Sequence, residues 1–374
     1  MAILQFLVWL FVVPIVCRRY VWDNVFGAVI AAYPNYGMEI AIFLSKVPVP
    51  PIVFVGYNLV MLPIYAGNVP FFEQYRILMV NKANGNGNGN NRAANNKATN
   101  TNTNNTKEQQ QQSNQQMHNQ QLQTQTQQYP PWPWFDPSPE VREDFWKLSH
   151  RSIKLSALNM LVIVPLMLAT SLYLEKKRNS SNSNSNNPNN PFLFDTGDEH
   201  WPSTFDNVRD ICTMTVLHEL GFYATHRLVH AVPFLYRYHK THHEYKINTT
   251  LASQHNHPVD YTLCIAAPFL LSVAAVPKSH SISQFQFALL ALYTNLDDHV
   301  GYAFPWSMVR WYPLSAATEE HEFHHSKNKG CYASKLSVCN TLFGGYQEYN
   351  RFYYGDNNIN DDGNNSSNSK KKQL

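Results

Sequence analysis

HELGFYATHRLVHAVPFLYRYHKTHHEYKINTTLASQHNH, from His218 to His257, is the most histidine-rich stretch of this chain, and HEFHH, from His321 to His325, repeats its pattern. Three short motifs in these stretches, HRLVH, HKTHH and HEFHH, together hold eight histidines. On a helix, residues three and four apart share a face, so each motif is expected to aim its imidazoles in one direction. Because chance scatter rarely places H-x-x-H-H in a chain twice, the pattern predicts a metal site.

Two metal ions account for the eight rings better than one. Neutral imidazole binds zinc, copper, nickel and iron, and one ion seldom accepts more than about four or five imidazoles while keeping an open position. The eight candidate ligands are His226, His230, His239, His242, His243, His321, His324 and His325.

The composition indicates a membrane setting. The mean hydropathy is only -0.36, but Asn-, Gln- and Ser-rich tracts lower it, and 44% of the residues are hydrophobic. Outside those tracts, apolar runs of roughly 12 to 20 residues recur, as in integral or deeply embedded membrane proteins. The net charge of +3 and the lack of a basic-aromatic pattern argue against nucleic-acid binding. We therefore predict an all-α, multi-helix integral membrane protein with a histidine-rich helical cap that holds two metals.

The chain divides into membrane-associated, polar and histidine-bearing parts. Asn/Gln-rich and Asn/Ser-rich tracts bury too little apolar surface to offset the entropy of ordering, so they are predicted to be disordered. The predicted parts are N-terminal membrane helices in residues 1–80, a disordered insertion in 81–128, a histidine-bearing domain in 129–354 with a disordered loop at 179–190, and a disordered tail in 355–374.

Two helices are expected between the Asn/Gln-rich insertion and the histidine motifs. Ser138 as N-cap and Pro139 in the first turn predict a helix start, and residues 153–174 form the best single spanning candidate, with about 20 apolar-dominated positions. A further apolar helix from Ile211 to Thr225 leads directly into HRLVH. The candidate ligands therefore begin where a membrane helix ends.

Two shorter apolar runs follow the second motif. Tyr261 to Val276 and Phe285 to Leu296 are too short to be assigned as full spans. As a shallow hairpin they would return the chain to the side it left. That arrangement places His299 beside the first two motifs.

The motifs, their order, HPVD at residues 257–260 and DHVGYAFPW at residues 298–306 resemble the fatty acid hydroxylase/sterol desaturase superfamily, whose members are membrane-bound non-haem di-iron enzymes. The resemblance covers roughly residues 72–77 and 129–348, and FEQYRI at 72–77 is similar to a short family motif. The flanks of HKTHH and HEFHH are most similar to C-4 methylsterol oxidases. Asp260 departs from the pattern, since a Glu is more usual there, and KLSVCNTLFGGYQEY after HEFHH lacks the residues common in methylsterol oxidases.

The resemblance implies that all eight clustered histidines are iron ligands. It adds His257 and His299 as the ninth and tenth ligands, with His255 as a competitor for His257, and leaves His218 either packed or ligating. The implied activity uses two ferrous ions, O2, and electrons from NAD(P)H through cytochrome b5 or a reductase. Iron held by neutral imidazoles activates dioxygen, here for the oxidation of a C–H bond of a lipid. A sterol oxidised at a C-4 methyl group is the first expectation, and a fatty acid or sphingolipid hydroxylase or a sterol desaturase is the alternative.

The localisation expected from the resemblance is the endoplasmic reticulum membrane, with several spans. Lys371 and Lys372 resemble a dilysine retrieval signal, which acts from the cytosolic side; the alternative is a solubilising basic tail. We therefore expect the C-terminus and the histidine motifs to be cytosolic.

Three functions of other classes stay open at this point. HEFHH also satisfies H-E-x-x-H, so His321, Glu322 and His325 fit a zinc protease with Glu322 as general base. That function leaves the two earlier motifs unexplained. The other two are a non-catalytic relative that binds metal or lipid, and a metal store or carrier.

Overall fold

The part of the chain that the computed structural model describes is helical. It comprises residues 27–32, 47–78, 130–170, 173, 202–276, 279–311 and 315–354. Within these residues there are two isolated β-bridges and no strands, so the all-α prediction is confirmed. The predicted insertion at 81–128, the loop at 179–190 and the tail with Lys371 and Lys372 lie outside the described residues. So does most of the predicted N-terminal membrane region before residue 47.

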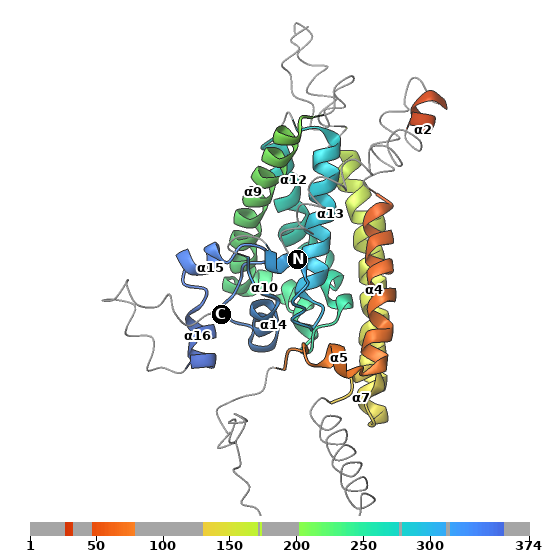
Figure 1. Cartoon of the computed structure of the whole chain (residues 1–374), viewed down its shortest axis with the longest axis vertical. Helices are drawn as coiled ribbons and strands as arrows, with labels where there is room; N and C mark the ends of the chain where they lie inside the picture. The colour runs from red at the N-terminus through yellow and green to blue at the C-terminus, as the bar shows by residue number, and fades with distance from the viewer. Residues whose placement is uncertain are drawn as a thin grey trace, which may run out of the picture.

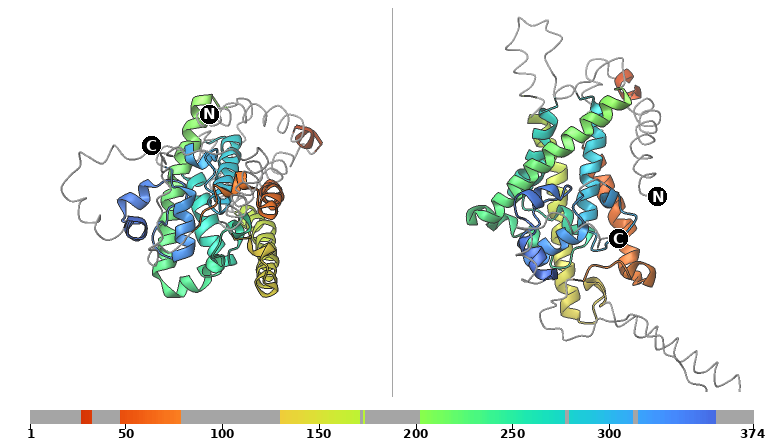
Figure 2. Two further views of the ribbon diagram at one scale, coloured as in Figure 1. Left: turned by 60° about the horizontal axis from the view of Figure 1, so that its bottom comes forward. Right: turned by 60° about the vertical axis from the view of Figure 1, so that its left-hand side comes forward.

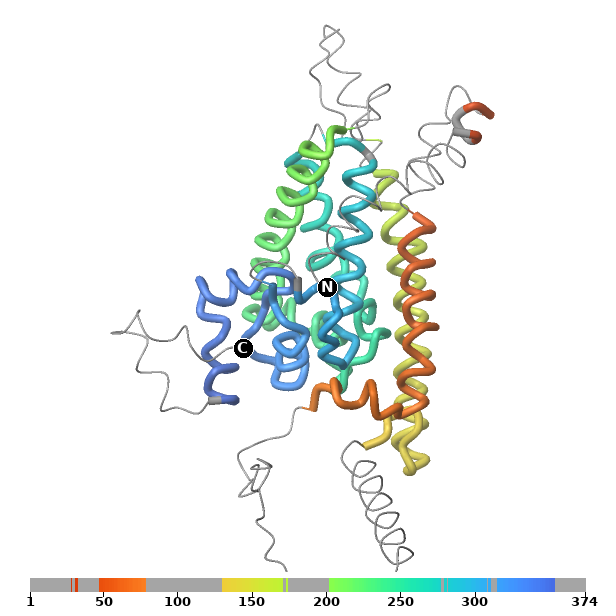
Figure 3. The backbone as a smooth tube through the Cα atoms, viewed as in Figure 1, coloured from red at the N-terminus to blue at the C-terminus, as the bar shows by residue number. Residues whose placement is uncertain are grey.

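Long helices run side by side along the long axis of the molecule (Figures 1 and 3). They are α4 (Val49–Gly67), α7 (Pro139–Leu158), α9 (Thr204–Ala231), the π-helical turn η7 (Tyr261–Ala266) with α12 (Ala267–Ala274), and α13 (Ser281–Asp298). A second π turn, η4 (Asn159–Ile163), extends α7, so that one helix runs from Pro139 to Thr170. The pair of α4 and α7 lies along one edge of the group, as the left view of Figure 2 shows.

Shorter helices complete the fold, most of them in the lower half of Figure 1. They are α2 (Gly27–Ala32), α5 (Pro70–Glu73), η3 (Pro133–Phe135), α10 (Pro233–His239), η5 (His242–Glu244), η6 (Thr250–Gln254), α11 (Pro258–Asp260), η8 (Met308–Trp311), α14 (Thr318–Lys327), α15 (Val338–Leu342) and α16 (Gln347–Tyr354). The histidine motifs therefore lie at one end of the long helices.

Two of the described helices, Val49–Gly67 and Pro139–Thr170, are long and apolar enough to cross a membrane. Both leave large apolar side chains uncovered. The following are at least half exposed: Ile52, Val55, Leu59 and Val60 of α4, and Ile153, Leu161, Val162 and Leu166 of the long helix that begins with α7. An exposed apolar surface of this extent is typical of a helix that contacts lipid or a partner.

The opposite face of α7 is polar and buried. The helix begins where Ser138 and Pro139 predict, although the Ser138 side chain makes no capping hydrogen bond. Further along, Ser156 Oγ donates to the carbonyl of Gln254 (3.3 Å), and Asn159 Nδ2 donates to the carbonyl of Asn256 (2.9 Å). This face therefore fixes the segment that follows η6.

The FEQYRI segment holds the start of DHVGYAFPW in place. Tyr302 Oη donates to the buried carboxylate of Glu73 (2.6 Å), and Trp132 Nε1 donates to Tyr302 Oη (3.0 Å). The Arg76 guanidinium lies 4.1 Å from the centroid of the Trp132 ring, where cation–π attraction adds to packing. Gly301 has a φ of +74°, and a Cβ there would lie 2.6 Å from Trp132. A glycine is required at this position by both conformation and space.

Candidate metal centre

Helix α9 supplies the first two histidines. Its N-cap Ser203 accepts a hydrogen bond from the backbone N–H of Asp206, and the helix continues to Ala231. His226 and His230 are four residues apart and point to the same side, as the spacing predicts.

The HKTHH motif does not lie on one helix face. Helix α10 ends at His239, and His242 lies in the 3-10 helix η5. The rings of His239 and His243 therefore join those of α9, whereas His242 enters a second group. The expectation that this motif aims all its imidazoles in one direction is wrong, because the α-helix stops inside it.

The HEFHH motif lies on α14 and is also divided. His321 and His325 are four residues apart and share the second group, while His324 joins the first. Adjacent residues on a helix point about 100° apart, so His324 and His325 face different sides. Helix α14 thus contributes to both groups, and the single-direction expectation is wrong here too.

The imidazoles form two clusters. The five-histidine cluster contains His226, His230, His239, His243 and His324, and the four-histidine cluster contains His242, His299, His321 and His325. Within each cluster the ligand atoms lie within 4.8 Å of one another. The structure therefore brings together nine of the ten histidines predicted from sequence, including His299.

The rings converge through their Nε2 atoms. Close Nε2–Nε2 distances are 3.0 to 3.2 Å in the five-histidine cluster and 3.0 to 3.3 Å in the four-histidine cluster. At a metal–nitrogen distance of about 2.1 Å, neighbouring ligand atoms lie about 3.0 Å apart in an octahedral and about 3.4 Å apart in a tetrahedral arrangement. The observed spacing fits ligands around a metal ion.

Burial lowers the pKa of eight of these nine imidazoles, which favours their neutral form. It lowers the pKa of His230 to about 3, with the neighbouring His239 adding to the effect, and that of His299 to about 4. Burial, followed by the neighbouring rings, also holds the pKa of His226, His242, His243, His321, His324 and His325 well below the usual value. A neutral ring keeps the lone pair that a metal needs.

Four of the rings are oriented through Nδ1. Each has an oxygen acceptor that fixes the tautomer, so the proton lies on Nδ1 and the lone pair on Nε2. The pairs are His226 with the carbonyl of Tyr332 (2.8 Å), His239 with the carboxylate of Asp260 (2.8 Å), His324 with the carbonyl of Gly330 (2.8 Å) and His299 with the carbonyl of Asn295 (2.7 Å). Lone pairs that face one another at about 3 Å repel unless a cation lies between them. The donor set therefore fits a metal in each cluster.

His257 lies outside both clusters. Its Nδ1 accepts a hydrogen bond from the backbone N–H of Val259 (3.2 Å) at the start of α11, and its ring centroid lies 4.7 Å from that of Tyr238. The predicted ninth ligand is thus used as a helix cap in this structure. Its ligand role has no support from the geometry.

The two competing histidines also lie apart from the clusters. His255 uses both ring nitrogens, Nδ1 with Ser152 Oγ (2.9 Å) and Nε2 with a carboxylate oxygen of Glu244 (3.0 Å). His218 has its Nδ1 3.4 Å from Nζ of the buried Lys335. Neither ring belongs to either cluster.

The Glu322 carboxylate contacts the backbone of a neighbouring segment. It accepts from the backbone N–H of Asn248 (3.4 Å), and burial raises its pKa to about 7. His321 and His325 share their cluster with two more histidines. This arrangement differs from a two-histidine protease helix.

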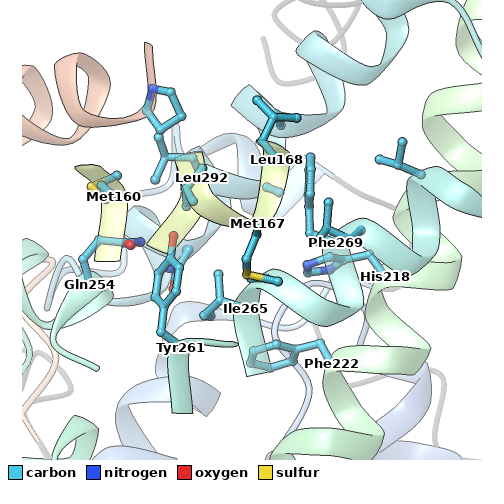
Figure 4. A pocket seen from close by; sticks show the side chains of 18 of the residues that line it. Met160, Met167, Leu168, His218, Phe222, Gln254, Tyr261, Ile265, Phe269 and Leu292 are labelled. Atoms are coloured by element: carbon cyan, nitrogen blue, oxygen red, sulfur yellow. The ribbon is translucent and has the colours of Figure 1, made fainter. Parts of the chain in front are cut away.

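A cavity of about 170 Å³ adjoins the clusters. Figure 4 shows Met160, Met167, Ile265, Phe269 and Leu292 around it, from α7, α12, α13 and the turns that extend them.

Two of the cavity's lining residues contact the metal centre. The Phe222 ring centroid lies 5.0 Å from that of His226, and the carbonyl of Asn295 is the acceptor for His299. Phe222 and Asn295 therefore lie between the cavity and the two clusters, whose own histidines are not among the lining residues.

Sequence reasoning missed the role of Asp260. In the sequence, Asp260 was noted only because the resembling family more usually has a Glu at this position, three residues after His257. A carboxylate within the histidine-rich region could have indicated a hydrogen-bond partner for a ligand histidine. The partner itself, His239, is 21 residues away in the sequence, so spacing did not identify it.

Comparisons with known proteins agree with this geometry. The fatty acid hydroxylase family matches residues 211–345, which include both clusters. Methylsterol monooxygenase erg25B of Aspergillus fumigatus is 29% identical over 36% of this chain and 47% of its own length. A cholesterol 25-hydroxylase-like protein of Danio rerio is 31% identical over 38% of this chain and 57% of its own. C-4 methylsterol oxidase erg25 of Schizosaccharomyces pombe is 26% identical over 41% of this chain and 52% of its own length.

The chain spans about half the length of these curated relatives. No solved structure matches it. The region that does match contains every histidine of the two clusters. The predicted resemblance is thereby confirmed: over residues 211–345 this chain is similar to the fatty acid hydroxylase family, with C-4 methylsterol oxidases among its relatives.

Proposed function

We propose that this protein is a membrane-bound di-iron oxygenase that uses O2 and reducing equivalents to oxidise a C–H bond of a lipid. A C-4 methyl group of a sterol is the proposed site of oxidation. One observation carries the proposal: two adjacent clusters of neutral, inward-facing Nε2 atoms lie beside an apolar cavity. A metal store or carrier has no use for such a cavity.

The metal ligands proposed are the histidines of the two clusters. Iron bound there would supply the activation of dioxygen, which iron(II) with imidazole ligands and open positions performs. Burial favours the neutral form of eight of the nine rings, and the Nδ1 acceptors hold four of the nine in a fixed orientation. Fixed ligands need little rearrangement on binding metal.

The cavity walls bind and position the lipid. Met160, Ile265 and Phe269 contribute apolar surface, and burial of apolar ligand surface is worth about 25 cal/mol per Å². The same walls exclude water, which protects reactive species from side reactions. Phe222 lies between this space and His226, so a bound lipid would lie next to the centre.

The exposed apolar faces of α4 and α7 support a membrane location, because they would otherwise face water. A lipid substrate would then enter from the bilayer. The resemblance supports the endoplasmic reticulum, with the histidine motifs and the C-terminus cytosolic. Electrons from NAD(P)H, delivered through cytochrome b5 or a reductase, complete the proposal, since iron must be reduced before it binds dioxygen.

The test is lipid-dependent oxygen consumption by the purified chain. The protein is loaded with iron(II) in detergent, supplied with NADH, cytochrome b5 and its reductase, and given a 4,4-dimethyl sterol or a long-chain fatty acid. We expect oxygen uptake with the sterol, and accumulation of 4-methyl sterols in cells that lack the protein. Uptake with the fatty acid alone would move the assignment to a fatty acid hydroxylase. No uptake with either lipid, in a chain that retains two irons, would contradict the oxygenase proposal.

A further inference from the structure

A buried amide oxygen at the wall of the cavity has no hydrogen-bond partner among the described residues. This atom is Oε1 of Gln254, which is 2% exposed. Gln254 lines the cavity from the end of η6, and Figure 4 shows its amide directed into the space near Tyr261 and Met160. Buried polar atoms in folded proteins nearly always have a partner, so an unpaired one inside a cavity points to a ligand.

The backbone that carries Gln254 is firmly held. Its carbonyl accepts from Ser156 Oγ of α7 (3.3 Å), and the carbonyl of the preceding Ser253 accepts from Asn295 Nδ2 of α13 (2.9 Å). Two long helices thus fix the residue from different sides. A side chain on such a support offers its amide at a defined place.

The segment that carries Gln254 is connected to the metal centre through Asn295. Asn295 makes the link, because its side chain bonds Ser253 while its carbonyl accepts from His299 Nδ1 (2.7 Å). A ligand bonded to Gln254 would lie in the cavity that Asn295 also lines. Asn295 in turn contacts the four-histidine cluster through its carbonyl.

The charges around the cavity favour a neutral ligand. Lys335 is the cation in its lining, but the carboxylates of Glu219 and Asp298 lie close enough to influence its charge. Glu219 accepts from the backbone N–H of Lys335 (2.8 Å), and Asp298 accepts from Ser334 Oγ (2.9 Å). Lys335 thus lies in an acidic part of the protein, which favours a neutral ligand over an anionic headgroup.

We propose that Gln254 is a specificity-determining residue that accepts a hydrogen bond from the hydroxyl of a lipid alcohol. The hydroxyl orients the lipid so that a carbon a few bonds away faces the metal centre. The second statement rests on the proposed oxygenase function, whereas the first concerns binding alone.

The experiment measures binding of matched sterols to the full-length protein in detergent, without electron donor. The probes are 5α-cholestan-3β-ol, the hydrocarbon 5α-cholestane and the ketone 5α-cholestan-3-one, which share one skeleton. Only the alcohol donates a hydrogen bond, so we expect it to bind about tenfold more tightly than the other two. Gln254→Leu should bring the three affinities to within about twofold of one another.

Leu292→Met is the matched control, because it changes the same cavity wall without altering its polarity. It should retain the preference for the alcohol. An alcohol preference that survives Gln254→Leu, a ketone that binds as well as the alcohol, or no binding of the alcohol would each overturn the inference. Palmitate that displaces the alcohol at a lower concentration would do so as well, by assigning the headgroup to Lys335.

The binding result is independent of turnover. Oxygen consumption with sterols, together with a preference for the alcohol that Gln254→Leu does not change, would support the proposed function and contradict the role of Gln254. A preference for the alcohol that depends on Gln254, together with no oxygen consumption, would support the binding role of Gln254 and contradict the proposed function.

Discussion

The two histidine clusters differ in how firmly the protein holds their rings. In the five-histidine cluster, His226, His239 and His324 donate from Nδ1 to oxygen acceptors. In the four-histidine cluster, His299 alone of the described rings does so. The Nδ1 atoms of His242, His321 and His325 are buried and have no partner within the part of the chain that the structure describes.

This difference predicts two sites of unequal affinity. Acceptors behind a ligand fix its orientation and raise its basicity, and their loss typically costs about 10- to 100-fold in metal affinity. The five-histidine cluster should therefore bind metal tightly. The four-histidine cluster should bind more weakly and be the more adaptable of the two.

The largest expected effect is that of His242→Ala. The substitution leaves three imidazoles in the four-histidine cluster, so we expect loss of about one metal per chain and of oxygen consumption. The five-histidine cluster should keep its metal, and the protein should stay in the membrane fraction. Metal analysis and an activity assay check this; retention of two metals with full activity would remove His242 from the ligand set.

Asp260→Ala tests the five-histidine cluster. It removes the acceptor of His239 Nδ1, so the affinity of the five-histidine cluster should fall about 10- to 100-fold. Asp260→Asn can still accept a hydrogen bond, so it should reduce the metal affinity of this cluster by a smaller factor. Competition against a chelator of known affinity measures both variants, and an unchanged affinity in Asp260→Ala would contradict the orienting role.

Removal of metal from the wild-type protein should occur in two steps. The four-histidine cluster has fewer fixed rings, so its metal should leave first as chelator concentration rises, with the two affinities about tenfold apart. Asp260→Ala should narrow or reverse this order. A single release step for both metals in the wild type would contradict the predicted difference in affinity between the two clusters.

The dependence on pH should be weak near neutrality. An exposed histidine has a pKa of about 6.5, whereas that of His230 is lowered to about 3 and that of His299 to about 4. A lowered pKa means that the folded rings stay neutral as pH falls, so protons do not compete for Nε2 until about pH 5. Below pH 6.5 the unfolded chain binds more protons than the folded one, so folding stability decreases with falling pH.

A series of metal analyses between pH 7 and pH 4 tests this point. We expect both metals to be retained down to about pH 5 and released below it. Release with a midpoint near pH 6.5 would show that the rings titrate as exposed histidines do.

The smallest effect is expected for His257→Ala. Its ring caps α11 and lies outside both clusters, so metal content should not change. Loss of the cap should lower the unfolding free energy by about 1 kcal/mol. Loss of a metal from this variant would restore His257 to the ligand set and show that the cap is not its main role.

Local spacing predicted much of this arrangement. The all-α class followed from apolar runs of helical length, and the shared direction of His226 and His230 followed from their spacing on one helix. The division of HKTHH between the clusters did not, because it depends on where α10 ends. The spacing alone gives no sign of that end.

Isolated residues were the limit of prediction from sequence. His257 and His299 each lie alone in the sequence and were both predicted as ligands. They differ through tertiary placement, because His299 follows α13 into the four-histidine cluster while His257 caps α11. The roles of Asp260 and Gln254 likewise depend on contacts with distant segments. Sequence periodicity carries no record of such contacts.

One chain is proposed to bind two irons, one in each cluster. The most direct measurement is quantitative metal analysis of the full-length protein after anaerobic loading with iron(II), combined with Mössbauer spectroscopy of an iron-57 sample. We predict two irons per chain in nitrogen-rich coordination. A single tightly bound zinc, or one iron that cannot be raised to two, would contradict the account.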